Sequence, residues 1–306
     1  MFIFHGLHEH SGRYAEFAKA CNSKGIICSA LDFFGHGRSI GYKESPGDIG
    51  RSWRELVSSG YSLVVSEMSN YEDQDVQIII FGHSMGALLA FHIVHALRER
   101  PDAPHPDMVI LCGIAMDAGP SAAAPFGCKC LNCIPLYCGP LARGIGWAIE
   151  KVDPQGSNSP IDGSQCTHDS QNLELRKQDF YHYLGDIRNR TGHQLLRASH
   201  EARKLFKKWG KVSATCQKAF RLLLLHGEED TLCYSSGSCK LFATCPVPPV
   251  QKFLKLYPNL YHELLNELPE DRAAVLKDIF TFIDDHPKRS GAASEKVSEV
   301  VTAHPI

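Results

Sequence analysis

Residues 78–88 read Ile-Ile-Ile-Phe-Gly-His-Ser-Met-Gly-Ala-Leu, an apolar run that continues through Gly-x-Ser-x-Gly into a helix-forming sequence. A nucleophile at a sharp turn between strand and helix takes a strained backbone conformation, and the flanking glycines let the two elements approach closely. The turn lifts the Ser84 hydroxyl clear of the sheet, and the helix start places the Met85 N–H where an oxyanion would form. The five-residue pattern alone can arise by chance, but this strand and helix context favours a nucleophilic serine.

Outward from this stretch, short apolar runs alternate with stretches of helical period. The alternation predicts an α/β fold with a mostly parallel sheet flanked by helices, because unbroken apolar runs are typical of strands covered on both faces. The expected strands span residues 2–5, 26–31, 76–81, 108–113, 221–226 and 251–257. The expected helices span residues 13–23, 51–68, 85–98, 235–243 and 270–284.

Residues 116–215 break this alternation, because no further strand of the same kind falls within them. The simplest interpretation is a segment inserted between two strands of one sheet. We therefore expect a core formed by residues 1–115 and 216–286, with an inserted lid at 116–215. Residues 287–306 are polar and aperiodic, which predicts a disordered tail.

The composition argues against several classes of protein. Lys plus Arg number 32 and Asp plus Glu number 34, a net charge of −2, so a nucleic-acid partner is not expected. Hydrophobic residues make up 43% of the 306-residue chain, enough for a full core. No stretch approaches the ~20 apolar residues of a transmembrane helix, and the first residues do not predict a secretory leader. The twelve cysteines are therefore expected to be reduced thiols in a cytoplasmic protein.

A nucleophilic serine needs a base, and the base needs an acid to orient it. In folds with this turn the chain order is serine, acid, histidine. Asp230 follows an expected strand at the edge where ligands bind in open α/β sheets, and it is our candidate acid. Glu228 and Glu229 are expected to be solvated loop charges. His262 lies on a loop after the last strand, and it is the histidine that falls in the right order.

A second oxyanion donor is expected from the loop after an earlier strand. The backbone N–H of Leu7 is the candidate, because His5-Gly6-Leu7 follows the first apolar run. It would act together with the N–H of Met85. His5 itself is expected to be a residue that packs the turn.

Five segments in order resemble the monoacylglycerol lipase family. Residues 5–14 (HGLHEHSGRY) resemble the family segment HGxGEHSGRY, and residues 32–39 (DFFGHGRS) resemble DHxGHGxS. Residues 82–86 match the family's GHSMG. Residues 226–233 (HGEEDTLC) resemble HGxxDxLC, and residues 261–267 resemble the segment that carries the family's histidine. The resemblance covers nearly the whole core but is loose over 116–215.

The resemblance implies an α/β-hydrolase fold with a lid, and cleavage of a monoacylglycerol to fatty acid and glycerol without a cofactor or metal. It implies Ser84, Asp230 and His262 as the catalytic triad. The resemblance further places Glu9, Arg13 and His83 as candidate substrate-binding residues. Glu9 and Arg13 can contact glycerol or only brace their loop, since an i,i+4 Glu/Arg pair is also ordinary local structure.

Two departures from the family pattern affect these expectations. Family members carry residues forming two further strands before the point where this chain begins, so we expect a truncated product with one sheet edge bare. Leu7-His8 replaces small residues beside the oxyanion donor, and His8 is expected to narrow the alcohol side of the pocket.

The expected lid carries four thiols in eleven residues: Cys128, Cys130, Cys133 and Cys138. Their spacing is not that of paired zinc knuckles. We interpret them as small apolar residues of a lid that contacts a membrane surface peripherally, together with aromatic residues such as Trp147. A buried helix and S-acylation of one cysteine are the alternatives. No oligomeric state is predicted.

The sequence is also compatible with two other functions. The triad does not select the alcohol group, so a lysophospholipase or broad carboxylesterase is the alternative enzyme. A catalytically silent hydrolase fold used for protein contacts is the alternative outside enzymes.

Overall fold

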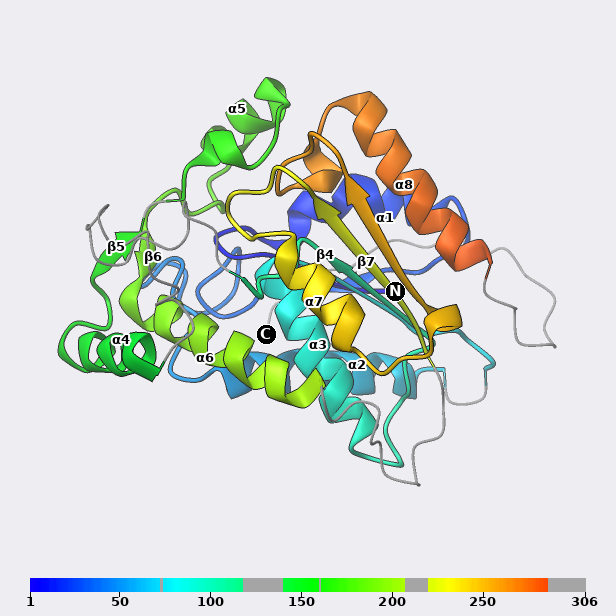
Figure 1. Cartoon of the computed structure of the whole chain (residues 1–306), viewed down its shortest axis with the longest axis horizontal. Coiled ribbons are helices and arrows are strands. Elements are labelled where there is room, and N and C mark those ends of the chain that lie inside the picture. The colour runs from blue at the N-terminus through cyan, green and yellow to red at the C-terminus, as the bar shows by residue number, and fades with distance from the viewer. Residues whose placement is uncertain (72–73, 118–139, 160, 207–219, 286–306) are drawn as a thin grey trace.

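The computed structural model describes residues 1–71, 74–117, 140–159, 161–206 and 220–285. At its centre lies a parallel six-stranded sheet with the order β2-β1-β3-β4-β7-β8 (Figure 1). Its strands are β1 (Phe2–Phe4), β2 (Ser29–Ala30), β3 (Ile79–His83), β4 (Met108–Cys112), β7 (Arg221–Gly227) and β8 (Lys252–Tyr257). The predicted α/β architecture with a parallel sheet is confirmed.

Both faces of the sheet are covered by helices. Ile80 of β3 packs into one apolar cluster with α2 (Trp53–Ser69), α3 (Met85–Arg98) and α7 (Ser236–Thr244). Ile79 and Phe81 point the other way, into a cluster with α1 (Ala15–Asn22) and α8 (Pro269–Asp284). Successive residues of a strand face opposite sides of its sheet, so strands buried on both faces need apolar residues at every position. This is why the strand sequences do not alternate.

Several expected elements differ from those observed at their ends. The strand expected at 76–81 is Ile79–His83. The strand expected at 26–31 is only Ser29–Ala30, because it lies at the sheet edge and pairs with just Phe2 and Ile3 of the short strand β1. The helix expected from residue 13 begins as an α-helix at Ala15. A 3₁₀ turn, Ser11–Tyr14, precedes it, and the Tyr14 hydroxyl of that turn donates to Glu9 in the loop after β1.

The described part of the expected lid contains three helices and a two-stranded antiparallel sheet. The elements are α4 (Pro140–Val152), β5 (Ser157–Ser159), α5 (Ser170–Gln178), β6 (Ile187–Arg188) and α6 (Asn189–Phe206). Helix α6 also packs on the core, since the ring centroids of Phe206 and of Phe91 in α3 lie 4.0 Å apart. The four lid cysteines between 128 and 138, and the expected tail at 287–306, fall outside the described residues. The domain division therefore stays a prediction.

Candidate active site

Ser84 occupies the turn between β3 and α3 with φ 54° and ψ −119°, in the left-handed region that a serine rarely adopts. The glycines on either side make this turn possible. A Cβ atom added to Gly82 would lie 2.3 Å from the carbonyl oxygen of Gly86, and one added to Gly86 would lie 2.0 Å from that of Phe4. Met85 is the first residue of α3, so its N–H has no carbonyl partner within the helix.

The structure brings Ser84, His262 and Asp230 together in a hydrogen-bonded chain. His262 Nε2 lies 2.8 Å from Ser84 Oγ, and His262 Nδ1 lies 2.6 Å from Asp230 Oδ2. A carboxylate can only accept, so His262 Nδ1 donates to Asp230, and its Nε2 accepts from the serine hydroxyl. A serine oxygen next to an unprotonated imidazole nitrogen can be activated as a nucleophile.

Asp230 is held at the carboxyl end of β7 and is only 2% exposed. Its Oδ1 accepts from the backbone N–H groups of Leu232 at 2.9 Å and Cys233 at 2.8 Å. Burial by itself would raise the pKa of Asp230, but the charge of His262 and the imidazole hydrogen bonds outweigh it and lower that pKa. Asp230 is therefore ionised at neutral pH. Glu228 and Glu229 are exposed, as expected.

Asp230 also contacts a second histidine, His226, for which the sequence predicts no role. His226 Nε2 lies 3.1 Å from Asp230 Oδ2, and the His226 side chain is fully buried. Its only sequence signal is its place at the start of HGEED, four residues before Asp230.

The loop after β1 lies directly against Ser84. A Cβ atom added to Gly6 would lie 3.2 Å from the Cβ atom of Ser84, so the backbone of the next residue, Leu7, begins close to Ser84. His5 packs the base of this loop, because it is fully buried and its Nε2 accepts from the N–H of Phe33 at 3.0 Å. This agrees with the packing role expected for His5.

Glu9, in the same loop, is buried with 3% of its surface exposed. Its Oε1 accepts from the Gly6 N–H at 2.6 Å, the Tyr14 hydroxyl at 2.6 Å and His83 Nδ1 at 3.0 Å. Burial opposes ionisation of Glu9, but the hydrogen bond and charge of His83 and the charge of Arg13 outweigh it and lower the pKa of Glu9. The contacts that the structure gives Glu9 thus brace the loop.

Arg13 and His83, the other two candidate binding residues, belong to the same buried cluster. Arg13 Nη2 lies 2.8 Å from Glu263 Oε2. His83 Nε2 lies 3.3 Å from the backbone carbonyl of His262. The cluster therefore joins the loop after β1 to the loop that carries His262.

Glu263 also joins the lid to the core, which the sequence did not indicate. Its Oε1 lies 3.5 Å from Nη1 of Arg176 in α5. Burial opposes ionisation, but Arg13 and Arg176 together lower the pKa of Glu263 to about 2. In the sequence, Glu263 is marked only by its position next to His262, and no motif marks Arg176.

The Glu263→Gln substitution is expected to destabilise the protein at neutral pH by about 3 kcal/mol, because it leaves two buried arginines without their shared carboxylate. A carboxylate with a depressed native pKa stabilises the fold above its unfolded pKa. That contribution is lost as the pH falls from the ordinary 4.5 toward about 2. Urea unfolding of both proteins between pH 7 and pH 3 should show the stability gap narrowing below about pH 4.5.

The exposed Glu228→Gln substitution is the matched control, and it should leave stability unchanged across this range. A stability gap that stays constant with pH would contradict the assignment of the depressed pKa to Glu263.

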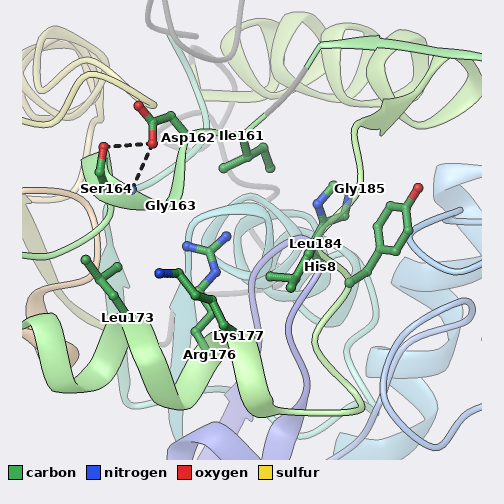
Figure 2. A pocket seen from close by; sticks show the side chains of 11 residues that line it. His8, Ile161, Asp162, Gly163, Ser164, Leu173, Arg176, Lys177, Leu184 and Gly185 are labelled. Carbon is green, nitrogen blue, oxygen red and sulfur yellow. Dashed lines mark hydrogen bonds between the residues drawn. The ribbon is translucent and has the colours of Figure 1, made fainter.

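His8 forms one wall of a cavity of about 370 Å³ between the loop after β1 and the lid (Figure 2). His8 has φ 67° and is 1% exposed, and its ring packs edge-on against Tyr183 with the centroids 4.8 Å apart. Figure 2 shows Arg176 and Lys177 pointing from α5 toward the loop of Asp162 and Ser164. The cavity thus offers hydrogen-bond donors and acceptors beside apolar side chains. The remaining lining residues are Ile161, Gly163, Leu173, Leu184 and Gly185.

Cys233 lies beside the triad but is poorly suited to react. Burial, and then the charge of Asp230, raise the pKa of its thiol well above the usual value. The thiolate is the reactive form of cysteine, so this thiol stays protonated and unreactive at neutral pH.

Neither a metal cluster nor a membrane span occurs in the part of the chain that the structure describes. No three or more histidine, cysteine or acidic side chains there are grouped so that they could hold a metal ion. No helix there is long and apolar enough to cross a bilayer.

Comparison with known proteins places this chain in a family. The model of the family described as "Serine aminopeptidase, S33" matches residues 1–269. Monoglyceride lipase from Homo sapiens is 27% identical over 300 residues, 96% of this chain and 85% of that protein. Monoacylglycerol lipase from Mycolicibacterium smegmatis is 27% identical over 288 residues, 93% of this chain and 87% of that protein.

A solved structure shows the same fold. It is a soluble variant of monoglyceride lipase from Saccharomyces cerevisiae in complex with a substrate analog, and it matches with a TM-score of 0.75 at 18% identity. The match covers 94% of this chain and 87% of that one. The fold is therefore that of the α/β hydrolases, and the resemblance indicated by the five sequence motifs is confirmed. Since the family model covers most of the chain, the protein belongs to the family of hydrolases described as serine aminopeptidase, S33.

Proposed function

We propose that this protein is a serine hydrolase that cleaves monoacylglycerol esters to a free fatty acid and glycerol. The observation that carries the proposal is the chain of hydrogen bonds from Ser84 through His262 to Asp230. The relatives named monoglyceride and monoacylglycerol lipase, which align along nearly the whole chain, supply the substrate class.

The first half of the reaction transfers the acyl group to Ser84. His262 Nε2 takes the hydroxyl proton while Ser84 Oγ forms a bond to the ester carbonyl carbon. Asp230 stabilises the resulting imidazolium through the 2.6 Å hydrogen bond to Nδ1. The carbon–oxygen bond to glycerol then breaks, and the leaving oxygen takes the proton from His262 Nε2.

The second half of the reaction regenerates the serine. A water molecule gives a proton to His262 Nε2 and attacks the carbonyl carbon of the acyl-enzyme. The bond to Ser84 Oγ breaks, the proton returns to that oxygen, and the fatty acid leaves.

The backbone N–H groups of Leu7 and Met85 stabilise the oxyanion in both halves. Met85 contributes a free N–H at the start of α3, where the helix dipole favours negative charge. Glu9 holds the Leu7 loop through the Gly6 N–H. We assign Glu9, Arg13 and His83 to positioning this loop against the histidine loop, because the contacts of all three are buried ones within the protein.

A substrate panel tests the proposal. Purified protein should release fatty acid from a monoacylglycerol dispersed in detergent faster than from a lysophospholipid or a methyl ester of the same acyl chain. The Ser84→Ala variant serves as the blank for each substrate. Preference for the lysophospholipid would instead favour the alternative enzyme, and absence of a fluorophosphonate adduct on Ser84 in folded protein would favour the silent fold.

We further propose that the lid contacts a membrane surface peripherally, where the lipid substrate resides. Large apolar side chains of the lid are unusually exposed: Trp147 by 56% and Val152 by 86% in α4, and Phe180 by 77% after α5. Exposed apolar side chains beside a lipid-ester site favour docking to a bilayer, since burying each one contributes about 1.5–3 kcal/mol.

The double substitution Trp147→Ser and Val152→Ser should weaken binding to liposomes by at least 10-fold, because it removes two apolar contacts with the bilayer. Sedimentation with liposomes measures this effect. Val250→Ser is the matched control, because Val250 is 80% exposed but precedes β8 at the opposite end of the sheet from Ser84. Equal liposome binding by all three proteins would refute docking through the lid.

A further inference from the structure

Asp230 is shared by two serine–histidine pairs. In the first pair, His262 Nδ1 contacts Asp230 and His262 Nε2 contacts Ser84. In the second pair the two ring nitrogens exchange roles. His226 Nε2 lies 3.1 Å from Asp230, and His226 Nδ1 lies 2.7 Å from Ser238 Oγ in α7. Both imidazoles meet the same oxygen, Asp230 Oδ2.

The partners of His226 determine where its proton lies. Its Nε2 also lies 2.8 Å from the backbone carbonyl of Cys233. The carboxylate and the carbonyl both accept, so His226 Nε2 must carry the proton and donate to them. In the neutral ring Nδ1 then accepts from the Ser238 hydroxyl, which fixes this tautomer.

The second pair cannot act as a second catalytic site. His226 and Ser238 are both 0% exposed, so no substrate reaches them. Their chemistry can act on the reaction only through the carboxylate that they share with the first pair.

We propose that His226, held in place by Ser238, is a positioning residue that orients Asp230 Oδ2 toward His262. It also reduces the electrostatic attraction between the Asp230 carboxylate and the proton of the His262 imidazolium. The inference rests on the proposed role of the triad. A donor on a carboxylate withdraws part of its negative charge, so the carboxylate stabilises a neighbouring imidazolium less. Loss of the His226 donor would therefore strengthen the attraction between Asp230 Oδ2 and a proton on His262.

The other charged and titratable groups around His262 are the same in every variant below. His83 is the nearest, with its ring centroid 4.9 Å from that of His262. Farther groups are Glu9 and Glu263, which act on His83, and Arg13, which acts on Glu263. The thiols of Cys112 and Cys233 interact with Asp230.

The test compares two substitutions at His226 in the 306-residue chain. His226→Phe keeps the ring shape but removes the donor, whereas His226→Gln places an amide N–H near the position of Nε2. NMR titration of the His262 ring, assigned by its loss in His262→Gln, gives the pKa of His262 without any substrate. The pH profile of kcat/KM gives the same quantity during hydrolysis.

In His226→Phe we expect the pKa of His262 to rise by about 0.5–1 unit. We expect kcat to fall about 10-fold, with KM within about twofold of the wild type. His226→Gln should restore the pKa and most of kcat. Ser238→Ala, a milder change, should raise the pKa in the same direction by a smaller amount, and it keeps the test valid if the phenylalanine variant does not fold.

His92→Gln is the matched control, because His92 is a buried histidine of α3 whose Nε2 lies 3.1 Å from the Ala198 carbonyl oxygen. It should lower stability without moving the pKa of His262. An unchanged pKa in both His226→Phe and Ser238→Ala, or equal losses in His226→Gln and His226→Phe, would overturn the inference. A shifted pKa in a protein that hydrolyses no ester would instead refute the proposed function and leave the positioning role standing.

Discussion

Replacing Ser84 with alanine is expected to lower kcat for monoacylglycerol hydrolysis by about 10⁴–10⁶-fold. The change removes the oxygen that forms the acyl-enzyme, and water must then attack without a covalent intermediate. The hydrogen bonds of the Ser84 hydroxyl to His262 and to the Cys233 thiol are lost, so the free energy of unfolding should fall by about 1–2 kcal/mol. Steady-state kinetics and thermal unfolding measure the two effects separately.

A second measurement identifies the nucleophile itself. A fluorophosphonate probe should label wild-type protein on Ser84, and Ser84→Ala should take up no label at the same concentration. Ser238→Ala is the matched serine control, because Ser238 is buried away from substrate, and that variant should still be labelled at Ser84. If Ser84→Ala kept most of its hydrolytic activity, the assignment of the nucleophile would be wrong.

The Gly86→Ala substitution is expected to damage both the fold and the site. The added Cβ atom would lie 2.0 Å from the carbonyl oxygen of Phe4 and 2.4 Å from that of His5. Backbone atoms cannot avoid the clash by changing rotamer, so β1 and α3 must move apart. This movement should lower the free energy of unfolding by about 3 kcal/mol or more. The Leu7 loop continues from β1, and a displacement of about 1 Å there should lower kcat/KM about 100-fold.

Urea unfolding and ester hydrolysis check both parts of this prediction. Gly144→Ala in α4 is the matched control, since a Cβ atom there would meet nothing within 4 Å. It should leave activity unchanged and raise stability by up to about 1 kcal/mol, through the higher helix propensity of alanine. A Gly86→Ala protein as stable and active as the wild type would contradict the close approach of β1 to α3.

Most of the sheet could be predicted because its strands depend on local sequence. Strands buried on both faces need continuous apolar residues, and each of the six expected ranges contains the observed strand or differs from it by at most three residues at an end. The strand at 26–31 was predicted too long, because the length of an edge strand depends on its partner, here β1.

The groups around the triad could not be predicted in the same way. Glu263 meets Arg176 from a lid helix, 87 residues away in the chain, and His226 meets both Asp230 and a serine of α7. These contacts depend on how α5, α7 and the loops pack, and no local pattern records that packing.

By itself the sequence determined the turn at Ser84, the order of serine, acid and histidine, and the parallel sheet that carries them. These features depend on interactions between near neighbours: glycines that permit a close approach, and apolar runs that must be buried. Only the tertiary structure decided that Glu9 braces the loop after β1, that Glu263 connects α5 to the loop that carries His262, and that two histidines contact Asp230. A buried charge or hydrogen-bonding group must find its partner wherever the folded chain provides one, and that place is set by packing rather than by distance along the sequence.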